Sequence, residues 1–575
     1  MTLLAWVALR WGPWRQLGGD GPTLILMMRR TIALVVAAAA LAAGFATAAS
    51  ATSVCTGTCF AAPAGSGPLL VFTGHGWGHG VGMSQYGAYG YAQHGWTAQQ
   101  ILSHYYPGTA VGKAPVSRVR VLLADKKKAL TLSSDVPFSV RDGLGKTHTL
   151  DAGAVTFGPT LMLTVDGQAT PQPLTAPLTF RAGVGAPLTL KLPYRGQIQV
   201  DVVDGKLRAI NVVGLEQYLY GVVPAEMPPN WSSEALKAQA VAARSYAMAT
   251  RQVGAPYDVF SDTRSQMYLG LSHEDPASNA AVDATKGQVL MFGGKIATTY
   301  FSSTSGGVTE SAADWVGTAV PYLVSVPDPF DTISPFHDWG PVPVTGKTIV
   351  SALKLQGPIT DVKTTLNGTG RVTTIDLFTQ TFDSPVAGTK LRDALGLRST
   401  WFDVGLLSLA PPTPSTPVVY GSSVSLSGFV RGLTGVSFEQ RPSAAPWQTV
   451  APVVPAADGS LRLTATPTIA TDYRLATPTD AAGAVHIKVM PLVQITAVTA
   501  DQVQGTELPL LPDAPVQVQL QNPDLTWTLT AQGTVGADGT FAVPATLPTG
   551  SIYRVVVTPG RGYAPATTTP LTVVR

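Results

Sequence analysis

The stretch VVPAEMPPNWSSEALKAQAVAARSYA, residues 222–247, contains the clearest helix signal in the chain. Ser232 or Ser233 can cap a helix predicted over residues 233–252, and Glu234 suits the positive end of its dipole. A stripe of small and apolar side chains at helical spacing indicates close packing against neighbouring elements. The stripe consists of Leu236, Ala240, Ala243 and Ala247.

The same stretch surrounds Glu226 with apolar residues. We expect residues 222–224 to end a strand and residues 227–229 to form a turn before the helix. Because apolar surroundings disfavour the charged form of a carboxyl group, they raise its pKa and let it donate a proton to a leaving oxygen near neutral pH. This is the profile of a glycosidase acid. The structural alternative is a loop carboxylate that caps the helix or pairs with Lys237 or Arg244.

Composition narrows the class of protein. The 575 residues suggest about three domains. Only 13% of them are charged, and 38 Lys and Arg nearly balance 35 Asp and Glu, so the chain lacks the basic field that nucleic acid needs. The 58 glycines, 46 prolines and many Val and Thr favour a mainly β fold with some α-helix.

The beginning of the chain predicts export. Two arginines precede the apolar run 31–45, and small residues follow it, so residues 1–51 are predicted to be a signal peptide. Translation from Met27 or Met28 would make the preceding residues a mis-assigned extension, and an uncleaved signal anchor is the alternative to cleavage. Residues 52–68 form a predicted linker, whose CTGTC motif favours a local disulfide over a metal site. We expect a secreted, extracytoplasmic protein.

Pattern changes divide the rest of the chain. Residues 69–408 are the size of a catalytic domain. Residues 116–213 within it alternate in period two with DG turns, which predicts an inserted β-rich subdomain, either a β-meander or a barrel-like sheet. Residues 409–419, rich in Pro and Thr, predict a linker between modules.

Residues 420–490 and 491–575 are predicted to be two Ig-like β-sandwich repeats, acting as a spacer or stalk or as an attachment module. Five positions recur at a constant offset of 80 residues. They are Trp447, Asp458, Gly459, Tyr473 and Arg474, matched by Trp527, Asp538, Gly539, Tyr553 and Arg554.

A glycine-rich and aromatic segment, FTGHGWGHGVGMSQYGAYGYAQHGW, occupies residues 72–96. His75 and His79 have the spacing of helical zinc motifs, but the glycines between them oppose a helix and no HExxH glutamate is present. The remaining interpretations are structural histidines in a glycine-permitted turn, or contact with a ligand and orientation of Glu226.

Several motifs together resemble one known family. They are NVVGLEQYLYGVVPAEM (211–227), ATKGQVLMF (284–292), YFSSTSGGVTESAADWVG (300–317), GHGWGHGVGMSQYGAYGYAQHG (74–95) and ILSHYYPGT (101–109). Over roughly residues 69–405 the chain is similar to the stage II sporulation protein D (SpoIID/LytB) family, whose members cleave peptidoglycan as lytic transglycosylases. In typical members GHGxGMSQ follows the catalytic glutamate, whereas here it precedes Glu226. We therefore expect a circularly permuted domain.

The resemblance implies a mechanism and a set of site residues. Glu226 would protonate the oxygen between N-acetylmuramic acid and N-acetylglucosamine, then deprotonate the muramoyl C6 hydroxyl to give a 1,6-anhydro end. The partners implied are peptidoglycan glycan strands, with wall polymers or other wall hydrolases reached through the C-terminal repeats. A non-catalytic wall-binding protein or amidase enhancer is the alternative. The expected substrate-binding residues are His75, His79, Ser84, Gln85, Arg244, Tyr246, Ser303, Thr304 and Ser305.

Zinc-binding members of that family carry a Cys/His cluster after the helix. Here the corresponding positions hold Ser261, Arg264 and Ser265, and Ser305 stands where the later motif often has Cys. Since Ser and Arg are not zinc ligands of the usual kind, we predict no metal and no cofactor. Hydrogen bonds among the hydroxyl groups are expected to hold the loop instead.

Overall fold

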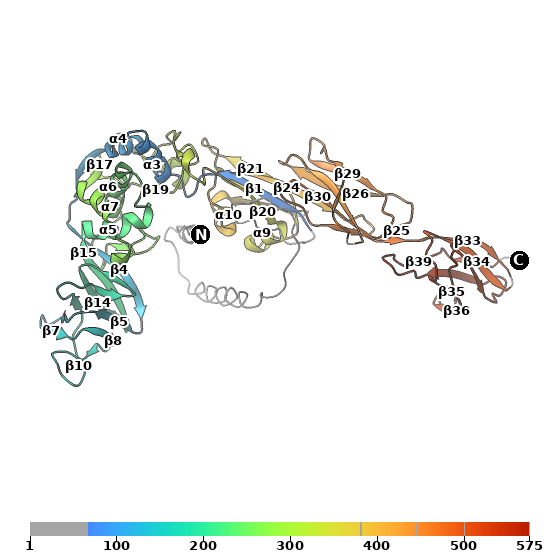
Figure 1. Ribbon diagram of the computed structural model, residues 1–575, viewed down its shortest axis with the longest axis horizontal. Helices are drawn as coiled ribbons and strands as arrows, with labels where there is room; N and C mark the ends of the chain where they lie inside the picture. The colour runs from blue at the N-terminus through green and yellow to red at the C-terminus, as the bar shows by residue number, and fades with distance from the viewer. Residues whose placement is uncertain (1–66, 380–381, 444, 500, 574–575) are drawn as a thin grey trace. The chain divides into compact units, whose positions relative to one another are not determined.

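The computed structural model describes residues 67–573, apart from 380–381, 444 and 500 (Figure 1). The predicted signal peptide and nearly all of the predicted 52–68 linker lie outside that range. The described chain divides into two compact units, one of residues 76–337 and one that joins residues 67–75 to residues 338–573. Within the described range, no helix has the length and apolar content needed to cross a bilayer.

Helix α6 (Ser233–Ala249) forms the centre of the first unit. It begins after Ser232, as predicted, and its predicted stripe is buried. Because the helix is buried on almost every side, small side chains let its neighbours approach closely. Figure 1 shows α3 and α4, in blue, beside the green helices that follow them by more than a hundred residues. The packed neighbours are α3 (Gln85–Gln93), α4 (Ala98–Tyr105), α5 (Leu215–Glu226), α7 (Pro276–Ala284) and β17 (Gln288–Phe292).

The β-rich part of the first unit contains the strands that alternation predicted. They form a seven-stranded and a four-stranded sheet over one continuous core. Neither sheet closes on itself in the described chain, so this β-rich part is not a closed barrel. Alternation reports which face is buried, whereas closure depends on pairing between the first and last strands.

The strands of this part are joined by tight turns at the predicted DG positions. Between β14 and β15, Asp204 and Gly205 both have positive φ, 49° and 66°, as a two-residue hairpin turn requires. The seven-stranded sheet runs β16 (Val259–Phe260), β4 (Arg118–Lys127), β15 (Lys206–Gly214), β14 (Gln197–Val203), β11 (Leu178–Arg181), β6 (Phe138–Arg141), β7 (Thr147–Leu150). The four-stranded sheet runs β13 (Leu192–Tyr194), β12 (Leu188–Leu190), β5 (Leu130–Ser134), β8 (Gly153–Phe157), and β9 (Met162–Leu163) pairs with β10 (Gln172–Pro173).

Short pairings attach the glycine-rich segment to the YFSSTSGG motif. Strand β2 (Met83–Ser84) runs parallel to β19 (Phe301–Ser302), and Trp77 and Thr304 form an isolated bridge. Strand β3 (Ala110–Lys113) pairs with β17, which also pairs with β18 (Lys295–Ile296). The unit also contains α8 (Ala312–Val316) and 3-10 helices at Gly270–His273 and Asp331–Ile333. Two motifs more than 200 residues apart thus form one structure.

The second unit corrects two predicted boundaries. Strand β1 (Leu69–His75) lies between β20 (Asp338–Thr345) and β24 (Phe402–Ala410), so residues 69–75 and 338–408 do not belong to the unit that contains Glu226. Strand β24 also pairs with β26 (Val424–Arg431), across the segment predicted to be a linker. The predicted linker therefore begins inside β24 and ends in β25 (Val418–Val419), and the sheet that contains β24 and β26 continues across it. Pro and Thr content marks an irregular segment, but it does not show whether the flanking strands pair.

Two β-sandwich modules follow, and the 80-residue repeat has a structural meaning. Arg474 stacks over Trp447 at 4.0 Å, and Arg554 stacks over Trp527 at 4.3 Å. Tyr473 and Tyr553 are buried at equivalent places in the two cores. The matched Arg and Trp residues therefore make the same stacking contact in both modules.

The remaining elements of the second unit are as follows. A small sheet and two helices accompany β1 and β20, namely β21 (Ile359–Leu366), β22 (Val372–Thr379), β23 (Asp383–Ala387), α9 (Gly346–Leu353) and α10 (Gly388–Leu395). The first sandwich adds β25 (Val418–Val419), β27 (Ser437–Pro442), β28 (Gln448–Pro452), β29 (Ser460–Ala465), β30 (Thr471–Ala476), β31 (Val485–Ile487) and β32 (Val489–Met490). The second comprises β33 (Leu492–Val498), β34 (Gln502–Leu508), β35 (Pro515–Gln521), β36 (Trp527–Thr534), β37 (Thr540–Pro544), β38 (Ile552–Val557), β39 (Ala566–Thr567) and β40 (Leu571–Thr572).

Candidate active site

Glu226 is the last residue of helix α5. The predicted strand at residues 222–224 is instead the last turn of this helix, which contains Pro224. A short run of apolar residues has the same pattern in a buried helix as in a buried strand. Periodicity therefore could not distinguish a helix from a strand at residues 222–224. The Glu226 side chain is half-buried, and its Oε1 accepts a hydrogen bond of 3.0 Å from the backbone N–H of Met267.

Two buried tyrosines lie close enough to Glu226 for its charge to affect them. Tyr218 is on α5 and Tyr246 is on α6. Burial is the largest cause that raises the pKa of both hydroxyl groups. The next causes are Tyr268 and then the charge of Glu226 for Tyr218, and Tyr300 and then the charge of Glu226 for Tyr246. Both hydroxyl groups therefore stay protonated and remain hydrogen-bond donors.

The glycine-rich segment packs onto the loop that follows Glu226. Tyr89 stacks on Trp231 with ring centroids 4.5 Å apart, and Tyr86 meets the same indole edge-on at 4.7 Å. Both tyrosines lie on α3, directly after the GHGWGHGVGMSQ sequence. The permuted segment thus contacts the loop between Glu226 and α6, as the permutation hypothesis expected.

His79 is joined to the same region through aromatic rings. Its ring stacks on Trp315 at 4.7 Å and meets Tyr300 edge-on at 5.9 Å, and Tyr300 in turn lies 5.7 Å from Tyr246. Since Val81 N–H donates to Nδ1 of His79, the proton of the neutral ring is on Nε2. The half-buried ring of Trp315 therefore belongs to the same aromatic cluster as Tyr246. Half-buried aromatic rings of this kind can stack on the faces of sugars.

The glycines of this segment are required by close approach. Gly76 and Gly78 have φ of +74° and +113°, which L side chains rarely adopt. A Cβ atom at Gly76 would lie 2.8 Å from the carbonyl oxygen of Ser305, and one at Gly78 would lie 2.6 Å from Cβ of Ser302. The unusual composition of the segment therefore allows it to pack directly against the SSTSGG motif.

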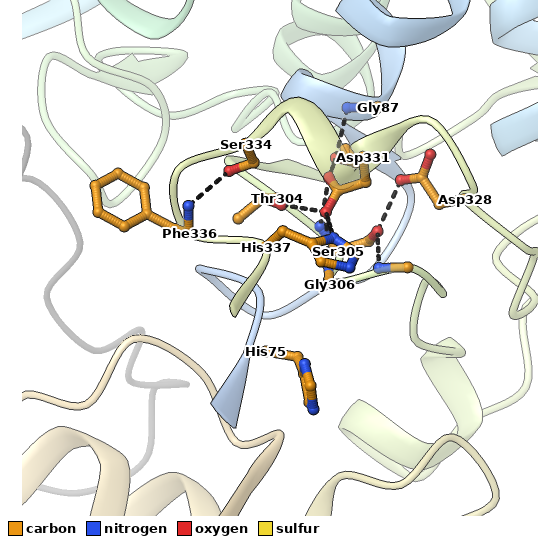
Figure 2. Close-up of polar contacts among 12 residues, drawn as sticks. His75, Gly87, Thr304, Ser305, Gly306, Asp328, Asp331, Ser334, Phe336 and His337 are labelled. Carbon is orange, nitrogen blue, oxygen red and sulfur yellow. Dashed lines mark hydrogen bonds and ion pairs between the residues drawn. The ribbon is translucent and has the colours of Figure 1, made fainter. Parts of the chain in front are cut away.

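Two buried aspartates hold these motifs together (Figure 2). Asp331 accepts hydrogen bonds from hydroxyl groups, backbone N–H groups and a histidine ring. The distances are 2.7 Å to Ser84 Oγ, 3.1 Å to Ser305 N, 2.9 Å to Gly306 N and 3.1 Å to His337 Nδ1, with a further short bond from Thr304 Oγ1. Asp328 accepts from Ser305 Oγ at 2.7 Å and Tyr105 Oη at 2.8 Å.

The pKa of one of the two aspartates is strongly shifted. Burial, followed by the charge of Asp331, raises the pKa of Asp328 to about 7. Of the two side chains, Asp331 accepts the larger number of hydrogen bonds.

This cluster corrects part of the predicted substrate-binding set. The hydroxyl groups of Ser84, Thr304 and Ser305 are buried and bonded to the aspartates, so they are structural in this conformation. Gln85 and Ser303 are also buried beside them. Sequence reasoning missed Asp328 and Asp331. The signal that could have indicated them is the presence of two acidic residues within four positions of an otherwise sparsely charged chain.

Arg244 is likewise a structural residue. Its side chain is completely buried, and Nη2 lies 2.6 Å from Oε2 of Glu216. Further hydrogen bonds run to the carbonyl groups of Val282 and Gln288. Burial excludes the predicted contact with a muramoyl carboxylate in this conformation, so Arg244 instead fastens α6 to α5, α7 and β17. Lys237 pairs with Glu234 at 2.6 Å, so both cations bind carboxylates other than Glu226.

His75 is in the other unit. It ends β1, where its Nδ1 lies 2.6 Å from Asp338 and its ring lies 4.9 Å from Trp401. His75 and His79 are only four residues apart in sequence, but they lie in different units.

Comparison with known proteins places this site in a family. The family model for the stage II sporulation protein SpoIID matches residues 203–292, which include Glu226 and α6. Stage II sporulation protein D of Bacillus amyloliquefaciens is 31% identical over 255 residues, which cover 39% of this chain and 69% of that protein. The chain belongs to the SpoIID family.

Other similar proteins match shorter regions. An uncharacterized protein of Brachyspira hyodysenteriae is 41% identical over 138 residues, 24% of this chain and 38% of that protein. The amidase enhancer of Bacillus subtilis is 42% identical over 113 residues, 20% of this chain and 15% of that protein. The chain thus spans well under half the length of these two relatives.

The residues at the positions predicted to correspond to the zinc cluster do not fit a zinc ion. Arg264 pairs with Asp262 at 2.8 Å and lies 3.9 Å over the ring of Phe260, while Ser265 Oγ accepts from Phe260 N–H. Ser305 is bonded to Asp328 instead. In the part of the chain that the structure describes, no group of three or more His, Cys, Asp or Glu is arranged to hold a metal. That the protein uses no metal stays a prediction.

Proposed function

We propose that this SpoIID protein is an exported lytic transglycosylase that cleaves peptidoglycan between N-acetylmuramic acid and N-acetylglucosamine. The observation that carries the proposal is the position of Glu226. It ends α5 with a half-buried carboxyl group close to two protonated tyrosines, and the loop that follows it contacts aromatic residues of the permuted motif. The other glutamates of the motifs have structural partners, since Glu216 bonds to Arg244, Glu234 to Lys237, and buried Glu310 to the N–H of Ser311.

The chemistry needs one carboxyl group. Glu226 donates its proton to the glycosidic oxygen while the bond from muramoyl C1 to that oxygen breaks. The resulting carboxylate then accepts the proton of the muramoyl C6 hydroxyl, whose oxygen bonds to C1 and forms the 1,6-anhydro ring. No water is consumed, and Glu226 ends protonated. A hydrolase would instead usually need a second carboxylate to act on water or on C1.

A second candidate is an activator without glycan-cleaving activity. It is favoured by the similarity to the amidase enhancer of Bacillus subtilis, a match of 42% identity. In that case the two sandwich modules would bind wall polymers or a wall hydrolase, and Glu226 would not be needed.

Digestion of purified sacculi by the full chain, followed by mass spectrometry, tests the two candidates. We expect 1,6-anhydro-muropeptides with the wild type and with Glu439→Gln, a control at a glutamate that pairs with Arg474 in the second unit. They should be absent with Glu226→Gln. Sedimentation with sacculi without any anhydro product from the wild type would support the activator instead.

A further inference from the structure

An open pocket of about 570 Å³ lies in the first unit at the start of strand β4. Its charged lining consists of Arg118, Arg120, Arg251 and Asp258. Three guanidinium groups face one carboxylate, so the pocket has a surplus of two positive charges. The volume is in the range of roughly 300–1,000 Å³ that is typical of small-ligand sites.

The three arginines are not equivalent. Arg120 is occupied, because it bonds to both carboxylate oxygens of Asp258 at 2.9 and 3.2 Å. Arg118 is exposed, and neither it nor Arg251 has a side-chain hydrogen bond or ion pair among the described residues. The Nε–H of Arg251 is moreover buried without a hydrogen-bond partner in the part of the chain that the structure describes. Since a buried unpaired donor is costly, Arg251 is suited to an acceptor that enters from outside the chain.

Chain segments that line the pocket lead to elements of the candidate active site. Arg251 follows the end of α6, the helix that carries Tyr246. Asp258 precedes β16, after which the chain reaches Met267, the residue that bonds to Glu226. Ser117 accepts the N–H of Leu215, at the opposite end of α5 from Glu226. At 1.5 Å per residue, α5 separates the pocket from Glu226 by roughly 17 Å.

We propose that this pocket binds a carboxylate carried by a muramoyl unit of the glycan strand, some sugars away from the bond that Glu226 cuts. The inference rests on the proposed function for its substrate class. Every muramoyl unit carries a lactyl group, which ends in a free carboxylate on peptide-free strands and in a stem peptide with its own carboxylates on other strands. The planar guanidinium groups of Arg118 and Arg251 suit either form, because arginine binds carboxylates in a bidentate manner.

Binding measurements on the full chain test the pocket independently of cleavage. All proteins carry Glu226→Gln so that strands stay intact, and Arg118→Gln and Arg251→Gln are added singly and together. Arg181→Gln is the control, because Arg181 is an exposed arginine on β11 of the same sheet and does not line the pocket. The probes are peptide-free glycan strands, the same strands with carboxylates converted to methyl amides, and peptide-bearing strands. Circular dichroism confirms that each variant is folded.

We expect the double variant to bind carboxylate-bearing strands about tenfold more weakly or worse, as loss of charged hydrogen bonds predicts. Methyl-amidated strands should bind weakly and equally to all variants, and Arg181→Gln should stay within about twofold of its parent. Loss on peptide-free strands identifies the lactyl carboxylate, and loss confined to peptide-bearing strands identifies the stem peptide. Unchanged binding of carboxylate strands, or equal loss on methyl-amidated strands, overturns the proposal. A chain that shows this charge-dependent binding but gives no anhydro products contradicts the transglycosylase proposal and not the pocket.

Discussion

Ser84 donates a hydrogen bond of 2.7 Å to Asp331, a residue 247 positions further along the chain. Both side chains are buried, and the bond joins the start of helix α3 to the short 3-10 helix of residues 331–333. It is one of the contacts that close the permuted segment onto the rest of the first unit. Asp331 therefore stabilises the arrangement that brings α3 against the loop after Glu226.

Asp331→Ala should destabilise the first unit strongly. The substitution leaves buried hydroxyl and N–H donors without an acceptor, and we expect a loss of about 3–5 kcal/mol in the free energy of unfolding. Urea denaturation followed by tryptophan fluorescence measures it. Ser84→Ala, which removes one donor, should cost only about 1–2 kcal/mol. Equal, small losses for both variants would show that the cluster is not a major source of stability.

Asp328 should make the stability of the first unit fall as pH rises. Its pKa is about 7 in the folded chain against an ordinary 3.8, so the folded state binds the proton more tightly than the unfolded state. This contribution is fully present below about pH 4 and is lost as pH rises towards about 7. The difference in unfolding free energy between wild type and Asp328→Asn isolates it. A difference that does not change between pH 4 and 8 contradicts the assignment.

Arg244→Met should lower stability rather than weaken glycan binding selectively. The variant leaves Glu216 largely buried without its cation, which typically costs about 3–5 kcal/mol. Lys237→Met is the matched control, because its pair with Glu234 is partly exposed and should contribute less than about 1 kcal/mol. Unfolding curves of the two variants provide the test. If Arg244→Met leaves the stability unchanged but raises the KM for glycan, Arg244 is a substrate-binding residue after all.

Glu507 predicts a second pH effect, in the last sandwich module. Its carboxyl group is buried and has no hydrogen-bond partner among the residues described by the structure, and burial raises its pKa to about 7. Because the folded pKa lies above the ordinary value of 4.5, the stabilisation by the bound proton is fully present below about pH 4.5 and is lost as pH rises towards about 7. Hydrogen exchange of the β34 amides, corrected for the intrinsic rate, should show protection falling between pH 5 and 8. Glu507→Gln should abolish this trend, and a trend that persists in the variant would exclude Glu507 as its source.

Trp231→Ala should impair the proposed reaction. The indole links Tyr86 and Tyr89 to the loop that follows Glu226, and a shift of the catalytic group of about 1 Å can cost tenfold or more in rate. We expect kcat/KM on peptidoglycan to fall by at least about tenfold, with partial recovery in Trp231→Phe. Trp527→Ala, in the second sandwich, is the control and should cleave normally. Normal cleavage by Trp231→Ala would show that the permuted segment is not needed to position Glu226.

Local patterns predicted the local structure well. The stripe from Leu236 to Ala247 identified α6 and its buried face, and DG pairs marked hairpin turns such as Asp204-Gly205. The same patterns failed at residues 222–224, where an apolar run was expected to be a strand and is the end of α5. Sequence motifs also predicted the family, which the comparisons confirmed, because motifs depend on short runs of residues. The catalytic role of Glu226 stays a prediction.

The sequence by itself determined the helix around which the first unit packs, the alternating strands, the 80-residue repeat and the identity of the motifs, since each depends on neighbours in the chain. Only the tertiary structure decided the use of the polar side chains. It directed Ser84, Thr304 and Ser305 to two aspartates, paired Arg244 with Glu216, and placed residues 338–408 with the sandwich modules. These outcomes depend on burial and on partners up to hundreds of residues away. A hydroxyl or guanidinium group that must be buried binds whichever acceptor the folded chain brings to it.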